Sequence, residues 1–98
     1  MKKKDIKNAT FLNAEVCSTK EELFTLFSEK LNFPDYFSGN WDSFEEIIND
    51  LPLNSDVIIL YNIDSLLPDQ PEEKSILLDI IHTANQNQKY QFYTLNKL

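Results

Sequence analysis

The sequence predicts an α/β fold in which a small three-stranded parallel sheet is covered by helices, in the order β-α-α-β-α-β. Three observations support this prediction. One short apolar run is bounded by turn residues, three segments carry apolar residues at helical spacing, and an aromatic, β-prone segment follows near residue 90. We expect residues 1–98 to form one domain, with residues 1–5 as a loose tail.

The first strand and the first helix are predicted within residues 7–31. Residues 7–12 form the strand, although their pattern is weak. Ser18 and Thr19 each lie three residues before a glutamate, so either pair can form a capping box at the start of the helix. Pro34 disfavours a helical residue before it and therefore ends this element. The apolar residues at helical spacing are Leu23, Phe24, Phe27 and Leu31.

The second helix is predicted to begin after Asn40, a good N-cap residue, and to run from residue 41 to about residue 51. At 100° per residue, Asp42, Glu46 and Asn49 gather on one side, and Glu45 lies between the two faces. Because apolar packing fixes the helix, its acidic side is held outward in a definite position. The apolar side consists of Trp41, Phe44, Ile47, Ile48 and Leu51.

The remaining elements complete the predicted sheet. Residues 56–61, DVIILY, are a continuous apolar run that predicts a strand buried on both faces. Residues 63–67 predict a helical turn, Pro71 suits the start of a third helix, and Asn87 suits its end. Residues 90–95, YQFYTL, predict the last strand. The apolar stripe of the third helix consists of Ile76, Leu77, Ile80, Ile81 and Ala84.

The composition argues against several functional classes. Nine basic residues face sixteen acidic ones, and the net charge of −7 repels nucleic acid and anionic membranes and favours basic partners. Solubility alone also explains such a charge. The single Cys17 allows no internal disulfide, which suits a reducing compartment. The first residues lack the apolar core of a signal peptide, and the longest apolar run is too short to span a bilayer. We therefore expect a cytoplasmic protein.

Catalytic and metal-binding patterns are weak in this sequence. The single glycine excludes a phosphate loop, and one Cys and one His exclude a clustered zinc site. A Cys17–His82 pair is a candidate nucleophile, because Cys17 precedes a helix N-terminus that would lower its pKa, but no oxyanion donor is recognisable. Asp79 and His82 lie one turn apart, which is more typical of surface electrostatics than of an acid–base dyad. We predict no cofactor and no metal.

The acidic side of the second helix favours binding. Asp42 and Glu46 point the same way, and two carboxylates can hold Mg²⁺ or Ca²⁺, but the spacing supplies no further oxygen ligands. The plainest interpretation is a solvated helix face, and the sharper one is a negative ridge that meets arginine or lysine. In the preceding loop we expect at least one of the rings of Tyr36 and Phe37 to be exposed. Exposed tyrosine beside fixed carboxylates is typical of interface hot spots.

The stretch Phe33–Glu46, FPDYFSGNWDSFEE, resembles the barstar family, the intracellular inhibitors of the bacterial ribonuclease barnase. The family signature is a Leu/Phe-Pro-acid-Tyr-aromatic-Gly loop, then Asn-x-Asp-Ala-Leu/Phe, then a second acid four residues past the first. The resemblance implies a three-stranded parallel sheet with helices packed on it and no enzyme activity. It also implies a 1:1 partner, a basic ribonuclease toxin whose phosphate-binding cleft is plugged by the acidic helix of its immunity protein.

Carried over by position, the resemblance implies which residues contact the partner. Tyr36 and Phe37 match the loop aromatics, and Asn40 matches the asparagine at the helix start. Asp42 matches the first interface acid, and Glu46 falls where the family's central aspartate enters the nuclease site. The rest of the predicted partner-binding set is Glu45, Asn49 and His82.

This chain departs from the family pattern at several of these positions. Glu46 is one methylene longer than the usual aspartate, Ser38 replaces a usual glycine, and Glu45 replaces an aromatic residue of barstar. On the last helix, His82 and Gln86 replace two acids, so the negative charge is weaker there. An immunity protein against a toxin ribonuclease other than barnase fits these departures equally well.

Two alternatives from other functional classes stay open. One is a barstar-like scaffold that does not bind a ribonuclease, which the failure to find any basic partner would favour. The other is a carboxylate enzyme or metal-binding protein, which needs Asp42, Glu46 and His82 to meet in one cleft.

Overall fold

The structure is a computed structural model that describes residues 9–50, 57–87 and 91–97. Along the chain the elements are β1 (Ala9–Asn13), η1 (Ala14–Val16), α1 (Lys20–Leu31), α2 (Trp41–Asp50), β2 (Val57–Tyr61), η2 (Ile63–Ser65), α3 (Pro71–Asn87) and β3 (Gln91–Leu95), where η marks a short 3-10 turn. The predicted order β-α-α-β-α-β is confirmed. The predicted tail and the predicted end residues 7, 8, 51, 56 and 90 lie outside the described residues.

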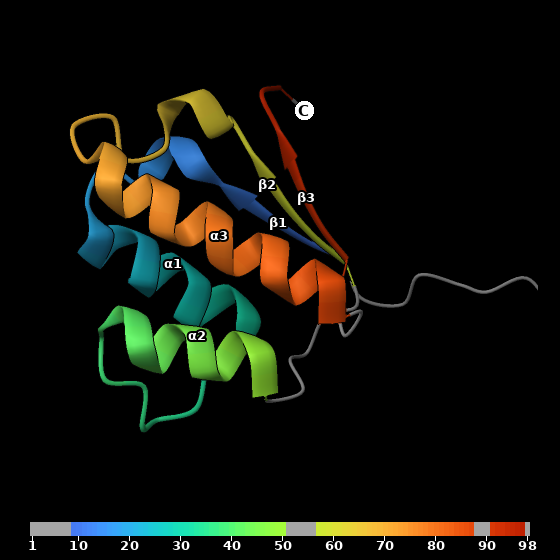
Figure 1. The fold of residues 1–98 in the computed structure, drawn as a ribbon. Coiled ribbons are helices and arrows are strands. Elements are labelled where there is room, and N and C mark those ends of the chain that lie inside the picture. The colour runs from blue at the N-terminus through green and yellow to red at the C-terminus, as the bar shows by residue number, and fades with distance from the viewer. Residues whose placement is uncertain (1–8, 51–56, 88–90, 98) are drawn as a thin grey trace, which may run out of the picture.

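The three described strands form one parallel sheet in the order β1-β2-β3 (Figure 1). Their register aligns Phe11 with Ile59 and Tyr93, and Leu12 with Leu60. β1 ends at Asn13, one residue later than predicted. Because successive strands lie side by side in sequence order, both crossover connections can lie on the same face of the sheet.

The prediction that the middle strand is buried on both faces is wrong. Ile58 and Leu60 are fully buried, but Val57, Ile59 and Tyr61 on the other side of β2 are only partly covered. The reason is that α1, α2 and α3 all lie on one side of the sheet (Figure 1). On that side, α1 packs against β1, α3 packs against β3, and α2 packs against α3.

Local side-chain chemistry fixes both ends of α1. Of the two predicted capping boxes, the Thr19–Glu22 pair forms: the Glu22 N–H donates to Thr19 Oγ1, and the Thr19 N–H donates to Glu22 Oε1, both over 3.2 Å. The Ser18 N–H donates to the same carboxylate oxygen over 2.9 Å. At the other end, Asn32 takes the left-handed conformation that commonly closes a helix.

The core lies between the sheet and the three helices, and the predicted apolar faces supply most of it. One correction concerns α3, where Ile76 is 36% exposed and Leu78 is the residue that packs partly against the core. Ile76 and Leu78 lie about 100° to either side of Leu77, so helical spacing alone does not decide between them, and the packing of α3 covers the Leu78 side. The buried residues of α1, α2 and α3 are Leu23, Phe24, Phe27, Leu31, Phe44, Ile47, Ile48, Leu77, Ile80, Ile81 and Ala84. In the described part of the chain, every helix is too short or too polar to cross a membrane.

Candidate protein-binding surface

The loop between α1 and α2 is anchored by one aromatic ring and exposes another. The Phe37 ring packs edge-on against Phe24 and Phe33, with ring centroids 5.3 and 5.2 Å apart. The backbone N–H of Phe37 donates to the Pro34 carbonyl over 3.1 Å. Tyr36, by contrast, is 59% exposed. The expectation of at least one exposed ring is confirmed at Tyr36, while Phe37 joins the edge of the core.

The start of α2 is held by polar contacts within the same loop. Asn40 caps the helix as predicted, because its Oδ1 accepts from the Ser43 N–H over 2.8 Å and its carbonyl accepts from the Phe44 N–H over 3.0 Å. The Ser43 hydroxyl accepts from the Ser38 N–H over 3.1 Å. Gly39 supplies the left-handed residue of the turn, with φ of +72°, so Ser38 needs no such conformation.

The two faces of α2 differ as the sequence predicts. Phe44, Ile47 and Ile48 are buried, whereas Asp42, Glu45 and Glu46 are exposed. Within the described residues, no Lys or His nitrogen lies within 4.0 Å of these three carboxylates. Asp42 stands in the first turn, where the positive end of the helix dipole also favours an acid. Asp42, Glu45 and Glu46 therefore present negative charge to solvent that no cation of the described residues pairs with.

A carboxylate from α3 holds the first residue of α2, and the sequence reasoning missed it. The Trp41 indole N–H donates to Glu73 Oε1 over 2.6 Å, and the Lys20 ammonium of α1 lies 3.8 Å from the same oxygen. One carboxylate of α3 thus contacts residues of both α1 and α2. The sequence feature that could have indicated this contact is the lone tryptophan at the edge of the apolar face, because a partly buried indole N–H needs an acceptor.

The two remaining predicted contact residues lie on α2 and on α3. Asn49 is half-buried, and its Oδ1 has no hydrogen-bond partner among the described residues. His82 is exposed on α3, the helix that packs against α2, and its Nε2 lies 3.3 Å from the side-chain nitrogen of Gln86. All eight predicted contact residues thus lie on α2, on the loop before it, or on the helix beside it. That they contact a partner stays a prediction.

The expectation of a lowered pKa at Cys17 is wrong. The side chain is fully buried, and burial, helped by the charge of Glu22, raises the pKa of the thiol to about 11. Its sulfur lies 3.9 Å from the Asn13 carbonyl, a contact that suits a neutral S–H donor. The helix N-terminus therefore does not activate this thiol, because removal from water outweighs the dipole.

The metal-binding alternative gains no support from the described residues. Among them, no three His, Cys, Asp or Glu side chains come together in a group that could hold a metal ion. Asp42, Glu46 and His82 are therefore not assembled into the cleft that this alternative requires.

A comparison with known protein families gives a match over most of the chain. The family model described as Barstar (barnase inhibitor) matches residues 8–96 of the 98-residue chain. A search of curated proteins found no match.

Proposed function

Because this chain belongs to the Barstar (barnase inhibitor) family, we propose that it binds a basic ribonuclease toxin and plugs its active-site cleft with the α2 face and the loop before it. The observation that carries the proposal is the exposed acidic face of α2, formed by Asp42, Glu45 and Glu46, which no cation in the described part of the chain neutralises. Ribonuclease clefts collect cationic groups to hold phosphates, and fixed carboxylates can occupy the same donors.

The surrounding contacts make this face rigid before any partner arrives. Phe37 and Trp41 anchor the loop and the helix start in the aromatic cluster, and Asn40 caps the helix. A preorganised surface loses little conformational entropy on binding, so more of its contact energy appears as affinity. Tyr36 stands exposed on the loop that leads into the acidic helix, where a tyrosine ring can cover the rim of a cleft.

The family membership suggests when and where such a protein acts. A cell that makes a toxic ribonuclease must bind it before it cuts cellular RNA, so we place this protein inside that cell as an immunity protein. The net charge of −7 supports fast capture, because opposite fields raise the association rate of two proteins.

The test is inhibition of RNA cleavage by purified ribonucleases. Two enzymes are used: barnase, and any basic ribonuclease captured by this chain from the native host. We expect cleavage by at least one of them to stop at a 1:1 ratio. A captured protein whose RNA cleavage is unchanged would favour the scaffold alternative, and no inhibition of either enzyme would contradict the proposal.

Glu46→Asp reports which kind of cleft the partner has. If the partner is built like barnase, the shorter acid should bind as well as the parent or better, because it restores the family's usual side chain. If the partner's pocket is built for the longer acid, the variant should bind more weakly. Titration of each ribonuclease with the two proteins gives the comparison.

Salt dependence tests the electrostatic part of the proposal separately. The association rate should fall steeply between low and physiological ionic strength, while the dissociation rate changes less. Stopped-flow mixing across a salt series measures both rates. An association rate that does not respond to salt would indicate an apolar interface instead of a plugged cationic cleft.

A further inference from the structure

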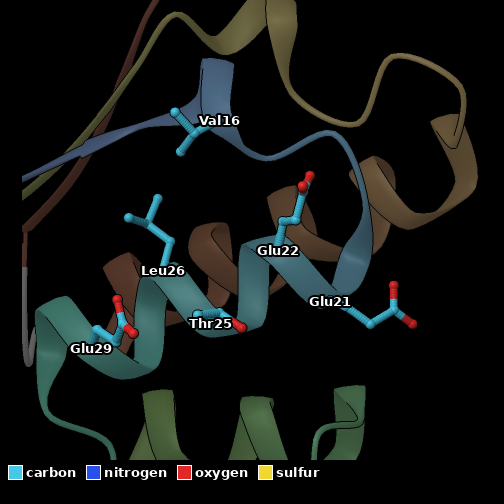
Figure 2. A pocket seen from close by; sticks show the side chains of 6 residues that line it. All are labelled: Val16, Glu21, Glu22, Thr25, Leu26 and Glu29. Atoms are coloured by element: carbon cyan, nitrogen blue, oxygen red, sulfur yellow. The ribbon is translucent and has the colours of Figure 1, made fainter.

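The outer face of α1 carries a hollow that lies outside the proposed ribonuclease-binding residues. This α1 groove has a volume of about 360 Å³. In Figure 2, the side chain of Leu26 points from α1 toward Val16 on η1, Glu22 and Glu29 lie to either side along the helix, and the Glu21 side chain extends outward from the first turn of α1. The lining residues are Val16, Glu21, Glu22, Thr25, Leu26 and Glu29.

The floor of the α1 groove is apolar and partly open to water. Val16 is 54% exposed, although it is aliphatic, and Leu26 is half-buried against the core. An aliphatic side chain placed between them would remove apolar surface from water on both partners, which stabilises a complex by about 25 cal/mol per Å².

The rim of the α1 groove is negative. Three of its six lining residues are glutamates, and none of the six is a cation. Glu22 is held in place by the N–H groups of Ser18 and Thr19. Within the described residues, no cationic side chain pairs with Glu21 or Glu29. The rim therefore offers carboxylates for a cationic partner.

A second hollow lies on the other side of the same glutamates. It has a volume of about 530 Å³ and shares Glu21, Thr25 and Glu29 with the α1 groove, and its far wall includes Phe24 and Phe37. Glu21, Thr25 and Glu29 are spaced four residues apart and form one row along α1. Eight residues of helix span about 12 Å, so the backbone positions of Glu21 and Glu29 lie about that far apart along the helix.

We propose that the α1 groove is a docking site for a basic peptide segment of another protein. One aliphatic side chain of the segment occupies the space between Val16 and Leu26. Two cationic side chains on either side of it meet Glu21 and Glu29. Four steps of an extended chain cover about 13 Å, which matches the spacing of these two positions along the helix. The charge of the rim selects a basic segment, and the apolar floor selects an aliphatic residue at its centre.

This site is separate from the proposed ribonuclease contact. Glu21, Glu29 and Val16 are not among the eight predicted contact residues on α2, its loop and α3. Docking at the α1 groove therefore does not require the chain to inhibit a ribonuclease, and the two proposals can fail independently.

The test is an NMR titration of the full-length, ¹⁵N-labelled chain with the capped peptide K-S-L-S-K, whose two lysines lie four residues apart. We expect amide shifts at Val16, at Leu26 and along α1. The capped peptides K-S-S-S-K and E-S-L-S-E should bind much more weakly, because each lacks one half of the recognition. An absence of shifts with K-S-L-S-K, or shifts confined to the acidic face of α2, would overturn the proposal.

Matched variants separate the α1 groove from net charge. Glu21→Gln combined with Glu29→Gln should weaken binding of K-S-L-S-K about three- to tenfold, the effect of losing two exposed ion pairs. Asp35→Asn combined with Asp79→Asn removes the same charge at exposed positions outside the groove lining and should change binding less than about twofold. Equal losses from the two double variants would show that the peptide senses only overall charge and would overturn the proposal.

Two further variants test the apolar floor of the α1 groove and whether its ligand comes from another protein. Val16→Thr keeps the shape but replaces a methyl with a hydroxyl, and it should weaken K-S-L-S-K but not K-S-S-S-K. The chain itself begins with a basic segment, so a variant in which Lys2, Lys3, Lys4 and Lys7 are glutamines is the last arm. If that variant binds K-S-L-S-K several-fold more tightly than the parent, the chain's own lysines compete for the site, and the proposal of an external partner is wrong.

Discussion

The inward and outward faces of α2 differ in burial and in charge, although they belong to the same helix. Phe44, Ile47 and Ile48 face the core and are fully or almost fully buried, whereas Asp42 and Glu46 face solvent. The inward face loses contact with water on folding, and the outward face keeps it until a partner arrives. Stability and binding are therefore assigned to different residues of one helix, and substitutions can separate them.

The largest effect is expected on the inward face. Phe44 is fully buried and contacts Phe24, Phe27 and Trp41, so Phe44→Ala should lower the free energy of unfolding by about 3–5 kcal/mol. Urea unfolding of the parent and the variant measures the loss. A loss below about 1 kcal/mol would show that the inward face of α2 is not the core side.

Cys17, buried next to the start of α1, should make stability depend on pH above neutrality. Its pKa is raised from 9.0 to about 11 in the folded chain, so the folded chain keeps a proton that the unfolded chain loses. The contribution is complete below pH 9 and is lost as pH rises toward 11, by about 2–3 kcal/mol in total. Urea unfolding across this range, with Cys17→Ala as the baseline, measures it. Identical pH profiles for the two proteins would contradict the raised pKa.

Glu73 tests what fixes α2 in place. Glu73→Leu leaves the Trp41 indole N–H without its acceptor and should cost about 1–3 kcal/mol of stability. Glu73→Gln keeps an acceptor and should cost less. Glu72→Leu, at the exposed neighbouring position, is the matched control and should cost about 0.5 kcal/mol or less. The fluorescence of Trp41, the single tryptophan, reports both unfolding and the loss of this contact. Equal effects of the Glu72 and Glu73 substitutions would mean that the contact does not hold the helix.

The smallest effect on stability is expected on the outward face. Asp42→Ala and Glu46→Ala should each change the free energy of unfolding by about 0–1 kcal/mol, with Asp42 the larger because it stands at the positive end of the helix dipole. The same urea experiment applies. Losses as large as that of Phe44→Ala would show that the two faces of α2 are not functionally distinct.

Local patterns predicted the fold well where short-range physics decides it. The N-caps at Thr19 and Asn40 and the faces of α2 follow from side chains a few residues apart. The sequence did not predict that β2 is fully buried on one face only, because an apolar run does not reveal how many faces of a sheet the helices cover. The prediction of a lowered Cys17 pKa was wrong for a similar reason. The position of Cys17 before a helix can be read from the local sequence, whereas its burial depends on the whole fold.

The candidate site was predicted only in part, for the same physical reason. The exposed acids follow from helical periodicity, so sequence was enough to find them, whereas for Tyr36 and Phe37 it predicted only that at least one ring is exposed. The contact from Glu73 to Trp41 joins residues 32 positions apart, and no local pattern contains it. The α1 groove also depends on tertiary structure, because Val16 and Leu26 face each other only after η1 folds against α1.

The most direct test of the separation between the two faces is the dissociation constant of Glu46→Gln for the ribonuclease that the parent inhibits. This variant keeps the shape of the side chain and removes its charge, so cationic groups in the cleft lose their partner. We expect a loss of about 2–5 kcal/mol in affinity, with a change in stability below about 1 kcal/mol. Glu45→Gln, at the flank, should lose about 0–1 kcal/mol of affinity. If Glu46→Gln binds as tightly as the parent, the acidic face of α2 does not enter the cleft, and the central claim is contradicted.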